Sequence, residues 1–338
     1  MTQSTQSNLF EITALSAVDT YKLGHVDQLP EGVEYIYSNF TPRFDKHFAG
    51  KNNKYYDGKV VVAGIRTMVE FINRLWNETF FNVPLEHVLA EYTDLVAPFV
   101  TGEVTTKHII ALHNLGFLPV EIRALDEGLV VNTNIPVLTV CNTVSGFGWV
   151  VGFLEDLISA ENWKVSTNAT TARLYRKIME AYATKMGVPL WFVNYQGHDF
   201  SLRGLGGIVD GSNSGQGHLM YFEGTDNLPA VNRIRKIYGD KYVGCSVSAT
   251  EHLVSSSSIL TSGIEDKQEA EAAFFKRYIT EIYPSGICSY VSDTYDYWGF
   301  LENVLPDFVD VINARGNDAN GMSKVVVRPD SGDPVHVD

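Results

Sequence analysis

The chain has 338 residues, of which 45% are hydrophobic and 20% are charged, and its formal net charge is −14. This composition predicts a large buried core, and the acidic surplus argues against a general nucleic-acid or anionic-membrane binder. The three cysteines lie far apart without metal-ligand spacing, and the sequence has neither a signal pattern nor an apolar run of membrane length. We therefore expect a reduced, cytoplasmic protein without a structural zinc site.

The N-terminal half predicts helices around a small sheet. We expect a strand over 33–40, helices over 64–80, 85–98 and 104–115, antiparallel strands over 118–124, 128–131 and 136–141, and helices over 149–161 and 171–186. The glycines Gly116 and Gly187 are natural ends for two of these helices.

After Pro189 the pattern changes to strand, polar loop and helix, repeated. We expect strands over 190–195, 222–226, 241–247, 287–291 and 325–327, and helices over 212–221, 228–238, 248–260 and 266–283. Such βα units favour a parallel sheet, either a barrel or a doubly wound sheet. Because the sequence stops just after a strand end, we expect an incomplete α/β barrel.

Polar and often charged side chains follow five of these strands in succession. They are His198, Asp199 and Arg203; Asp226; Ser246, Ser248, Glu251 and His252; Ser292, Asp293 and Asp296; and Arg328 with Asp330. One polar strand end is ordinary, since loops are polar. Five in succession are typical of an active site at the carboxyl end of an α/β barrel.

These residue types suit a phosphorylated sugar. Arg203 and Arg328 can bind phosphate with two parallel hydrogen bonds each. Asp296 and Asp330 can accept hydrogen bonds from ribose hydroxyls or hold magnesium with its waters. The segment 246–250 opens a predicted helix, where backbone N–H groups and hydroxyls can receive an anion.

His252 lies beside Glu251 at this helix start and has two interpretations. It is either a general base or phosphate-accepting nucleophile, or a histidine packed in the first turn. A serine-hydrolase interpretation fails because the formal match to the nucleophile elbow, residues 211–215, follows no apolar strand.

Six segments together carry a family resemblance. They are Asp19-Thr20-Tyr21-Lys22, residues 198–204 (HDFSLRG), 223–226 (EGTD), 246–252 (SVSATEH), 291–296 (VSDTYD) and 328–332 (RPDSG). In this order they resemble the type II phosphoribosyltransferase family, and specifically its nicotinamide-using members, from about Thr13 to the end of the sequence.

The resemblance implies a fold and a division of the chain. The fold is an incomplete type II phosphoribosyltransferase α/β barrel with an N-terminal α+β subdomain. Residues 1–37 would form an arm that packs on the barrel and on a dimer partner, 38–187 the subdomain, and 188–338 the truncated barrel. Family members continue beyond the position of Asp338, with a phosphate-binding loop, so the activity of this chain alone stays open.

The activity implied is the reaction of nicotinamide with phosphoribosyl pyrophosphate to give nicotinamide mononucleotide and pyrophosphate, in NAD salvage. Magnesium and ATP would be the cofactors, and a homodimer with shared active sites the assembly. Two alternatives remain, namely a nicotinate phosphoribosyltransferase and a catalytically silent fragment that only binds a ligand or partner.

The resemblance also assigns roles around the pyridine ring. Phe200 and the other subunit's Tyr21 would sandwich the ring, and Asp226 would accept a hydrogen bond from its carboxamide. A carboxylate at that position should repel nicotinate. Arg203 would lie near the ring and the phosphate.

The remaining implied roles concern phosphate and phosphohistidine. ATP would phosphorylate His252, with Glu251 and Asp296 in support. Arg328 would bind phosphate and Asp330 the ribose hydroxyls. Further implied substrate contacts are Ser246, Val247, Ala249 and Ser292.

Overall fold

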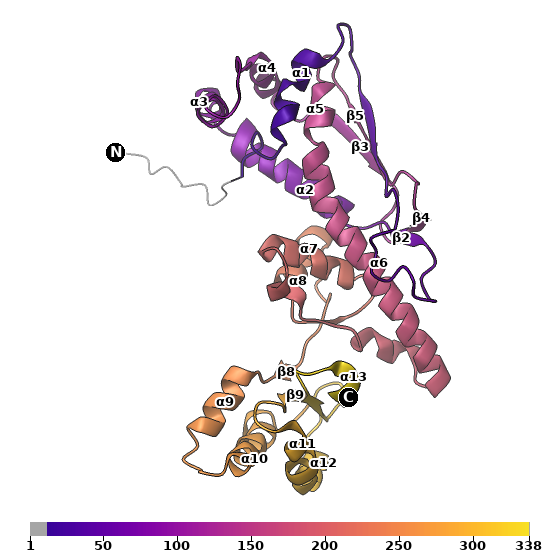
Figure 1. The fold of residues 1–338 in the computed structure, drawn as a ribbon, viewed down its shortest axis with the longest axis vertical. Coiled ribbons are helices and arrows are strands. Elements are labelled where there is room, and N and C mark those ends of the chain that lie inside the picture. The colour runs from indigo at the N-terminus through magenta and orange to yellow at the C-terminus, as the bar shows by residue number, and fades with distance from the viewer. Residues whose placement is uncertain (1–11, 338) are drawn as a thin grey trace. The chain divides into compact units, whose positions relative to one another are not determined.

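The structure is a computed structural model that describes residues 12–337, so residues 1–11 of the predicted arm and Asp338 lie outside the described part. Its elements pack within two units, Met1–Cys245 and Ser246–Asp338 (Figure 1). This boundary falls inside the predicted barrel segment, and the three-part division of the chain stays a prediction.

The first unit contains two small antiparallel sheets. In one sheet β5 (Leu138–Asn142) lies between β1 (Tyr37–Phe40) and β3 (Val120–Ala124). In the other, β2 (Lys59–Val61) pairs with β4 (Val130–Asn132). The prediction that 128–131 joins the sheet of its sequence neighbours is therefore wrong, because strand partners are chosen by distant packing that local periodicity does not encode.

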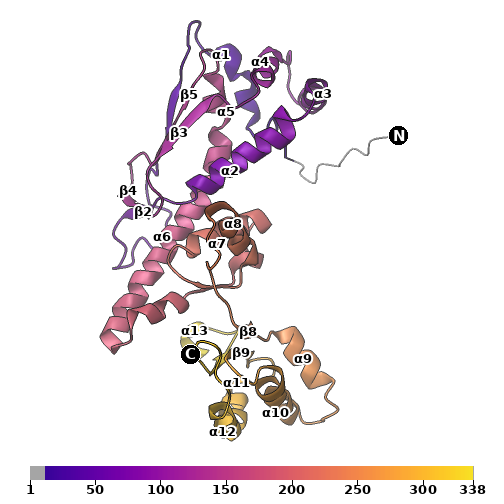
Figure 2. The same cartoon turned by 180° about the vertical axis from the view of Figure 1, so that it is seen from behind.

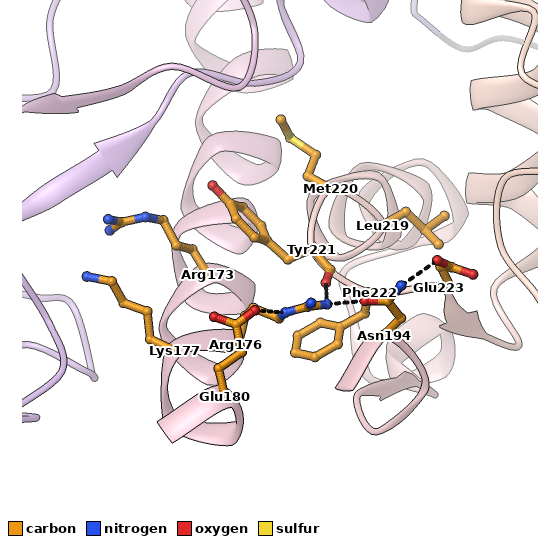
Figure 3. Close-up of a pocket in the computed structure, with 10 residues that line it drawn as sticks. All are labelled: Arg173, Arg176, Lys177, Glu180, Asn194, Leu219, Met220, Tyr221, Phe222 and Glu223. Atoms are coloured by element: carbon orange, nitrogen blue, oxygen red, sulfur yellow. Dashed lines mark hydrogen bonds and ion pairs between the residues drawn. The ribbon is translucent and has the colours of Figure 1, made fainter. Parts of the chain in front are cut away.

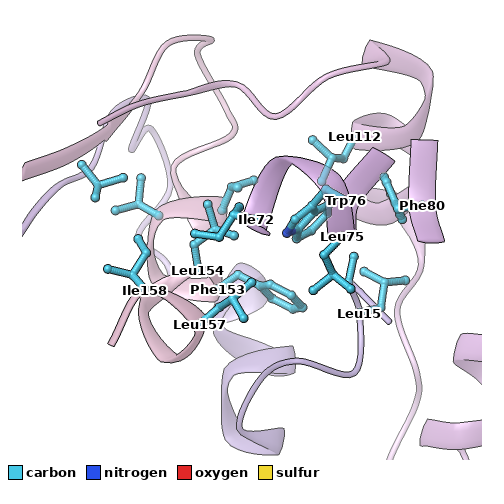
Figure 4. Close-up of a cluster of buried hydrophobic side chains, with 14 of the residues drawn as sticks. Leu15, Ile72, Leu75, Trp76, Phe80, Leu112, Phe153, Leu154, Leu157 and Ile158 are labelled. Atoms are coloured by element: carbon cyan, nitrogen blue, oxygen red, sulfur yellow. The ribbon is translucent and has the colours of Figure 1, made fainter. Parts of the chain in front are cut away.

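Helices cover the first sheet and enclose the main core of this unit. They are α1 (His25–Gln28), α2 (Ile65–Trp76), α3 (Leu85–Val96), α4 (Lys107–Leu115) and α5 (Trp149–Phe153). Trp76 and Phe80 are almost fully buried at its centre, with ring centroids 5.2 Å apart in an edge-on arrangement (Figure 4). Gly116 ends α4 with a positive φ of 81°, as predicted.

The helix expected at 149–161 begins as α5, and a single 32-residue helix, α6 (Glu155–Met186), covers the rest of it, the segment that follows and the helix expected at 171–186. The polar segment between them is helical because it is buried: Val165 and Ala169 are fully buried, and Asn162 Nδ2 donates to Ala63 O at 2.9 Å. The helix α7 (Ile208–His218) packs closely against it. A Cβ at Gly217 would lie 2.6 Å from Val165 O, so this contact requires glycine.

The segment that follows α6 differs from the prediction. Residues Leu190–Tyr195 form a 3₁₀ turn rather than a strand, with Val193 buried and Trp191 exposed. The strands are the two-residue β6 (His198–Asp199) and β7 (Gly224–Thr225), which pair in parallel. The helix α8 (Leu228–Tyr238) matches its predicted bounds, with Asn227 as its cap.

The second unit is built on a parallel sheet in the order β10 (Lys324–Arg328), β9 (Ile287–Val291), β8 (Ser248–Ala249). The strand expected over 241–247 is absent from the described chain, where Cys245 makes only an isolated bridge to Gly224. The helices of the second unit are α9 (His252–Leu260), α10 (Lys267–Arg277), α11 (Tyr297–Gly299), α12 (Val309–Asn313) and α13 (Pro334–Val337). The helix predicted over 266–283 ends as a π-helical turn at Tyr278–Ile282.

An aromatic core fills the second unit. Phe275, Tyr290 and Phe300 are fully buried, and the Tyr290 and Phe300 rings stack 5.3 Å apart. This core holds α10 against β9 and so fixes the carboxyl end of the strand. Within residues 12–337, no helix is both long and apolar enough to cross a membrane.

Candidate active site

The first cluster of predicted site residues lies at the ends of β6 and β7. The register of these strands places His198 opposite Gly224, and His198 Nε2 lies 3.1 Å from Asp226 Oδ1. A histidine of β6 and the carboxylate that directly follows β7 therefore form one polar edge.

A buried carboxylate fixes the two loops that carry these groups. Asp199 is 7% exposed, and its carboxylate accepts hydrogen bonds from Ser201 N at 2.9 Å and from Asn227 Nδ2 at 3.1 Å. Asn227 Nδ2 also donates to Gly211 O at the start of α7. Asp199 therefore holds the loops in place and does not itself face the surface.

The aromatic side chain of this edge is Phe200. Its ring centroid lies 4.7 Å from that of His198 at an interplanar angle of 33°, and the side chain is 53% exposed. Arg203, in the 3₁₀ turn Ser201–Gly204, is also exposed. An exposed ring face with a carboxylate and a cation near it can receive a small, flat, polar ring.

Tyr21 is the other predicted ring plate, and it is 63% exposed. Its 3₁₀ turn, Thr20–Gly24, is tied down by Lys22, whose Nζ lies 2.8 Å from a Glu155 oxygen and 2.9 Å from an Asp156 oxygen. In both views α1, which directly follows this turn, lies beside α5, whereas α7 lies farther along α6 (Figures 1 and 2). The fold does not bring the Tyr21 turn to the Phe200 loop within one chain.

The second cluster surrounds His252, the first residue of α9. His252 Nδ1 lies 3.1 Å from Thr294 Oγ1. Its Nε2 lies 3.4 Å from Asp330 Oδ2 and 3.7 Å from Asp293 Oδ1. One ring nitrogen is thus held by a hydroxyl, and the other faces two carboxylates.

Asp293 organises the loop after β10. Its Oδ2 accepts hydrogen bonds from Asp330 N, Ser331 N and Ser331 Oγ at 2.6–2.8 Å. Burial would raise the pKa of Asp293, but the hydrogen bonds from Ser331 and Asp330 outweigh it and hold the pKa below its usual range. The group therefore stays a carboxylate next to His252.

Arg328 joins this cluster through the same loop. Its Nη1 donates to Asp330 Oδ1 at 2.7 Å and its Nη2 to Thr250 O at 2.9 Å. Thr250 in turn accepts from Val291 N at 2.8 Å, at the end of β9. The ends of the three parallel strands are therefore linked around His252.

In the described chain, neither of the two predicted supports of His252 makes a hydrogen bond or ion pair with its ring. Asp296 Oδ1 accepts a hydrogen bond from Gly299 N at 3.0 Å and so caps α11. Glu251 is the residue before α9, and its side chain makes no capping hydrogen bond. The contacts of His252 come instead from Asp293 and Thr294, after β9, and from Asp330, after β10, two segments that the sequence already marked as polar strand ends.

The four remaining predicted substrate contacts differ in their exposure to solvent. Ser246, Val247 and Ala249 are exposed along the segment that leads to β8. Ser292 is fully buried, and its hydroxyl has no hydrogen-bond partner among the described residues. No set of three or more His, Cys, Asp or Glu side chains in the described chain forms a metal cage.

A hollow of about 570 Å³ lies beside α6, outside both clusters (Figure 3). Its lining includes Arg173 and Lys177, which both pair with Asp57, and Arg176, which pairs with Glu180. Its cations are thus neutralised by the protein itself. The hollow borders the residues before β6 and β7, whereas the polar edge follows these strands, so we do not take it as the site.

The chain is similar to known phosphoribosyltransferases. Residues 195–337 match the model of the nicotinate phosphoribosyltransferase (NAPRTase) family. The chain is 44% identical over 331 residues to a nicotinamide phosphoribosyltransferase of Acinetobacter baylyi, covering 97% of this chain and 64% of the relative. It is 28% identical to that of Mycoplasma pneumoniae, covering 94% of this chain and 66% of the relative.

A solved structure supports the fold. The crystal structure of human nicotinic acid phosphoribosyltransferase superimposes with a TM-score of 0.56 at 19% identity, over 93% of this chain and 61% of that one. The α/β prediction is thereby confirmed. The chain spans slightly less than two thirds of the length of its curated relatives, and these matches support its assignment to the type II phosphoribosyltransferase family.

Proposed function

We propose that this chain carries the nicotinamide site and the phosphohistidine site of a nicotinamide phosphoribosyltransferase. The reaction joins nicotinamide to phosphoribosyl pyrophosphate and releases pyrophosphate and nicotinamide mononucleotide, as a step of NAD salvage. The observation that carries the proposal is the edge formed by His198, Phe200 and Asp226, in a chain whose curated relatives bear that enzyme's name.

In this proposal the pyridine ring lies on the exposed face of Phe200. A carboxylate has about four acceptor positions, so Asp226 can bond to His198 and also accept from the carboxamide N–H. Nicotinate would place a second carboxylate there, which is unfavourable. Arg203, in the 3₁₀ turn that directly follows Phe200, adds positive charge where the phosphate of the product would lie.

Tyr21 completes the ring sandwich from a second copy of the chain. This assignment is supported by the distance of its turn from the Phe200 loop along α6 and by the exposure of its ring (Figure 2). The enzyme would then be a homodimer with shared sites. Electron-rich tyrosine and electron-poor pyridine favour offset stacking.

In the second cluster, His252 would attack the terminal phosphorus of ATP through the ring nitrogen that Thr294 does not hold, with ADP as the leaving group. Thr294 fixes the ring through Nδ1, so Nε2 is the reacting atom. Glu251 and Asp296 remain proposed supports, although the contacts to the ring are made by Asp293 and Asp330.

The phosphates and the ribose would meet the loop of Arg328. Arg328 supplies the cation and Asp330 accepts from the ribose hydroxyls, with Ser246, Val247, Ala249 and Ser292 as further proposed substrate contacts. Magnesium is usually held by one or two carboxylates together with substrate phosphates, and Asp330 is a carboxylate of that kind. Bound there, it would neutralise charge on the departing pyrophosphate.

The test is formation of the mononucleotide by this chain, with nicotinamide or nicotinate and with or without ATP. We expect nicotinamide to be used, and Phe200→Ala to raise its KM by about tenfold through loss of ring stacking. Phe99→Ala, which alters another exposed phenylalanine, is the matched control. A preference for nicotinate would favour the alternative enzyme, and no product from either would reject catalysis by this chain.

A further inference from the structure

The helix that begins with His252 is weak by itself. Its sequence contains the run Ser255–Ser258, serine being a poorer helix former than alanine or leucine, and no side chain caps its N-terminus. Leu253 and Leu260 are 70% and 69% exposed, so they contribute little packing. Only Ser255 and Ile259 of α9 are buried. The position of the first turn therefore depends on what Ser255 meets inside the unit.

Ser255 meets a buried polar layer. The Tyr290 hydroxyl, from β9, interacts with the Ser255 hydroxyl and with the carboxyl of Glu271 on α10. The three side chains are fully buried. No donor–acceptor pair among them has full hydrogen-bond geometry, so the layer consists of close polar contacts rather than of well-formed hydrogen bonds.

Glu271 is the unusual member of this layer. It is fully buried, and it forms no ion pair with any cation of the described residues. Burial raises the pKa of Glu271 from 4.5 to about 7; Tyr290 opposes this shift, and Asp296 and Asp293 add to it. A neutral carboxyl has an O–H to donate, which an ionised one lacks.

The layer connects the two elements that carry the second cluster. Ser255 lies three residues after His252, in the first turn of α9, and Tyr290 lies three residues before Asp293. The Tyr290 ring is locked by stacking on Phe300. Close polar contacts from Glu271 through Tyr290 to Ser255 thus connect the start of α9 to the end of β9.

We propose that Glu271 is a positioning residue of the His252 site, which acts in its neutral form through Tyr290 and Ser255 to hold the first turn of α9 on β9. The inference rests on the proposed function only in that it makes His252 the group being positioned. Glu271 itself touches no substrate.

The test is hydrogen–deuterium exchange of the full chain, followed on peptides from the first turn of α9, with the ¹³C signal of His252 at pH 6 as a second readout. We expect Glu271→Ala to speed exchange of this turn by about tenfold and to shift the His252 signal, since the turn has no cap to replace the layer. Glu271→Gln, a neutral isostere, should restore both. Glu269→Ala, on the same helix but exposed, should change neither.

The pH dependence separates positioning from simple packing. In the wild-type chain, exchange of this turn, corrected for its intrinsic rate, should rise as pH passes about 7, because Glu271 then ionises; in Glu271→Gln it should not. Tyr290→Phe should speed exchange of the turn at every pH, and it decides the matter if Glu271→Ala does not fold.

Unchanged exchange in Glu271→Ala, or in Tyr290→Phe, would overturn the proposal, as would a Glu271→Gln chain that behaves like the alanine variant. These readouts need no turnover. A chain that forms no mononucleotide but shows the expected exchange pattern would reject the proposed function and keep this inference.

Discussion

His198 Nε2 and Asp226 Oδ1 lie 3.1 Å apart, although 28 residues separate them in the chain. The pair exists because β6 and β7 are parallel neighbours in a register that places His198 opposite Gly224, two residues before Asp226. A histidine at this distance can offset part of the aspartate charge when it is protonated. The net charge of the His198–Asp226 pair should therefore decide whether the site accepts nicotinamide or nicotinate.

We predict that Asp226→Asn narrows the discrimination between nicotinamide and nicotinate. Removing the negative charge removes a repulsion that acts on nicotinate alone, and a change of about tenfold in the ratio of kcat/KM values is expected. Steady-state assays with both substrates measure this ratio. Asp94→Asn, on the exposed face of α3, is the control, and an unchanged ratio in Asp226→Asn would show that this carboxylate does not read the substrate.

Lys22 should matter for the Tyr21 turn. Its side chain is 3% exposed and bonds to Glu155, Asp156 and Gly152 O. Lys22→Met removes these bonds and leaves two carboxylates side by side, so we expect a loss of about 2 kcal/mol in the free energy of unfolding of the first unit. Urea denaturation measures this loss.

The same variant should also raise the KM for nicotinamide more than it lowers kcat, if Tyr21 is a plate of the ring sandwich. Lys236→Met, at an exposed lysine of α8, should leave both stability and KM near the wild-type values. A stable Lys22→Met chain with normal KM would contradict the role given to this anchor.

Asp293 is predicted to support both the loop after β10 and the His252 ring. Asp293→Asn keeps the size of the side chain but weakens acceptance from Asp330 N and Ser331, because a neutral amide offers one carbonyl in place of a carboxylate. We expect labelling of His252 by γ-³²P-ATP to fall by about tenfold. His252→Ala should abolish the label, and Asp310→Asn, at an exposed aspartate of α12, should retain it.

The raised pKa of Glu271 predicts that the free energy of unfolding depends on pH. Its pKa in the folded chain, about 7, lies above the ordinary 4.5, so the folded state holds its proton more tightly than the unfolded state does. This contribution is fully present below pH 4.5 and is lost as pH rises to about 7, a difference of about 3 kcal/mol. Denaturation of wild-type and Glu271→Gln chains at several pH values should show this loss only in the wild type, and parallel curves would disprove it.

Local sequence signals were sufficient where the chain makes its own structure. α8 and β9 have their predicted bounds, and Gly116 and Gly187 end helices as expected, with positive φ angles. Polar strand ends likewise indicated both clusters. In each case the information lies within a few residues, because caps, glycine conformations and strand periodicity are local.

Partners chosen over long distances were not predictable. The apolar run 190–195 suits a strand but forms a turn that buries Val193 alone. The helix α6 continues through a polar stretch because Val61, Ala63 and α7 bury one side of it. Around His252, the identity of its contacts depends on where the loops of β9 and β10 meet, which no single segment specifies.

The continuity of α6 has a mechanical consequence. At 1.5 Å per residue its 32 residues extend about 48 Å, and along that length it contributes Leu157 to the main core, Val165 to a second cluster and Ala172 to a third. One residue inserted near Thr167 would turn everything beyond it by about 100° relative to the part before it. The helix therefore fixes the orientation of these three packing surfaces relative to one another. An insertion or deletion within it would change that orientation for every surface beyond the site of the change.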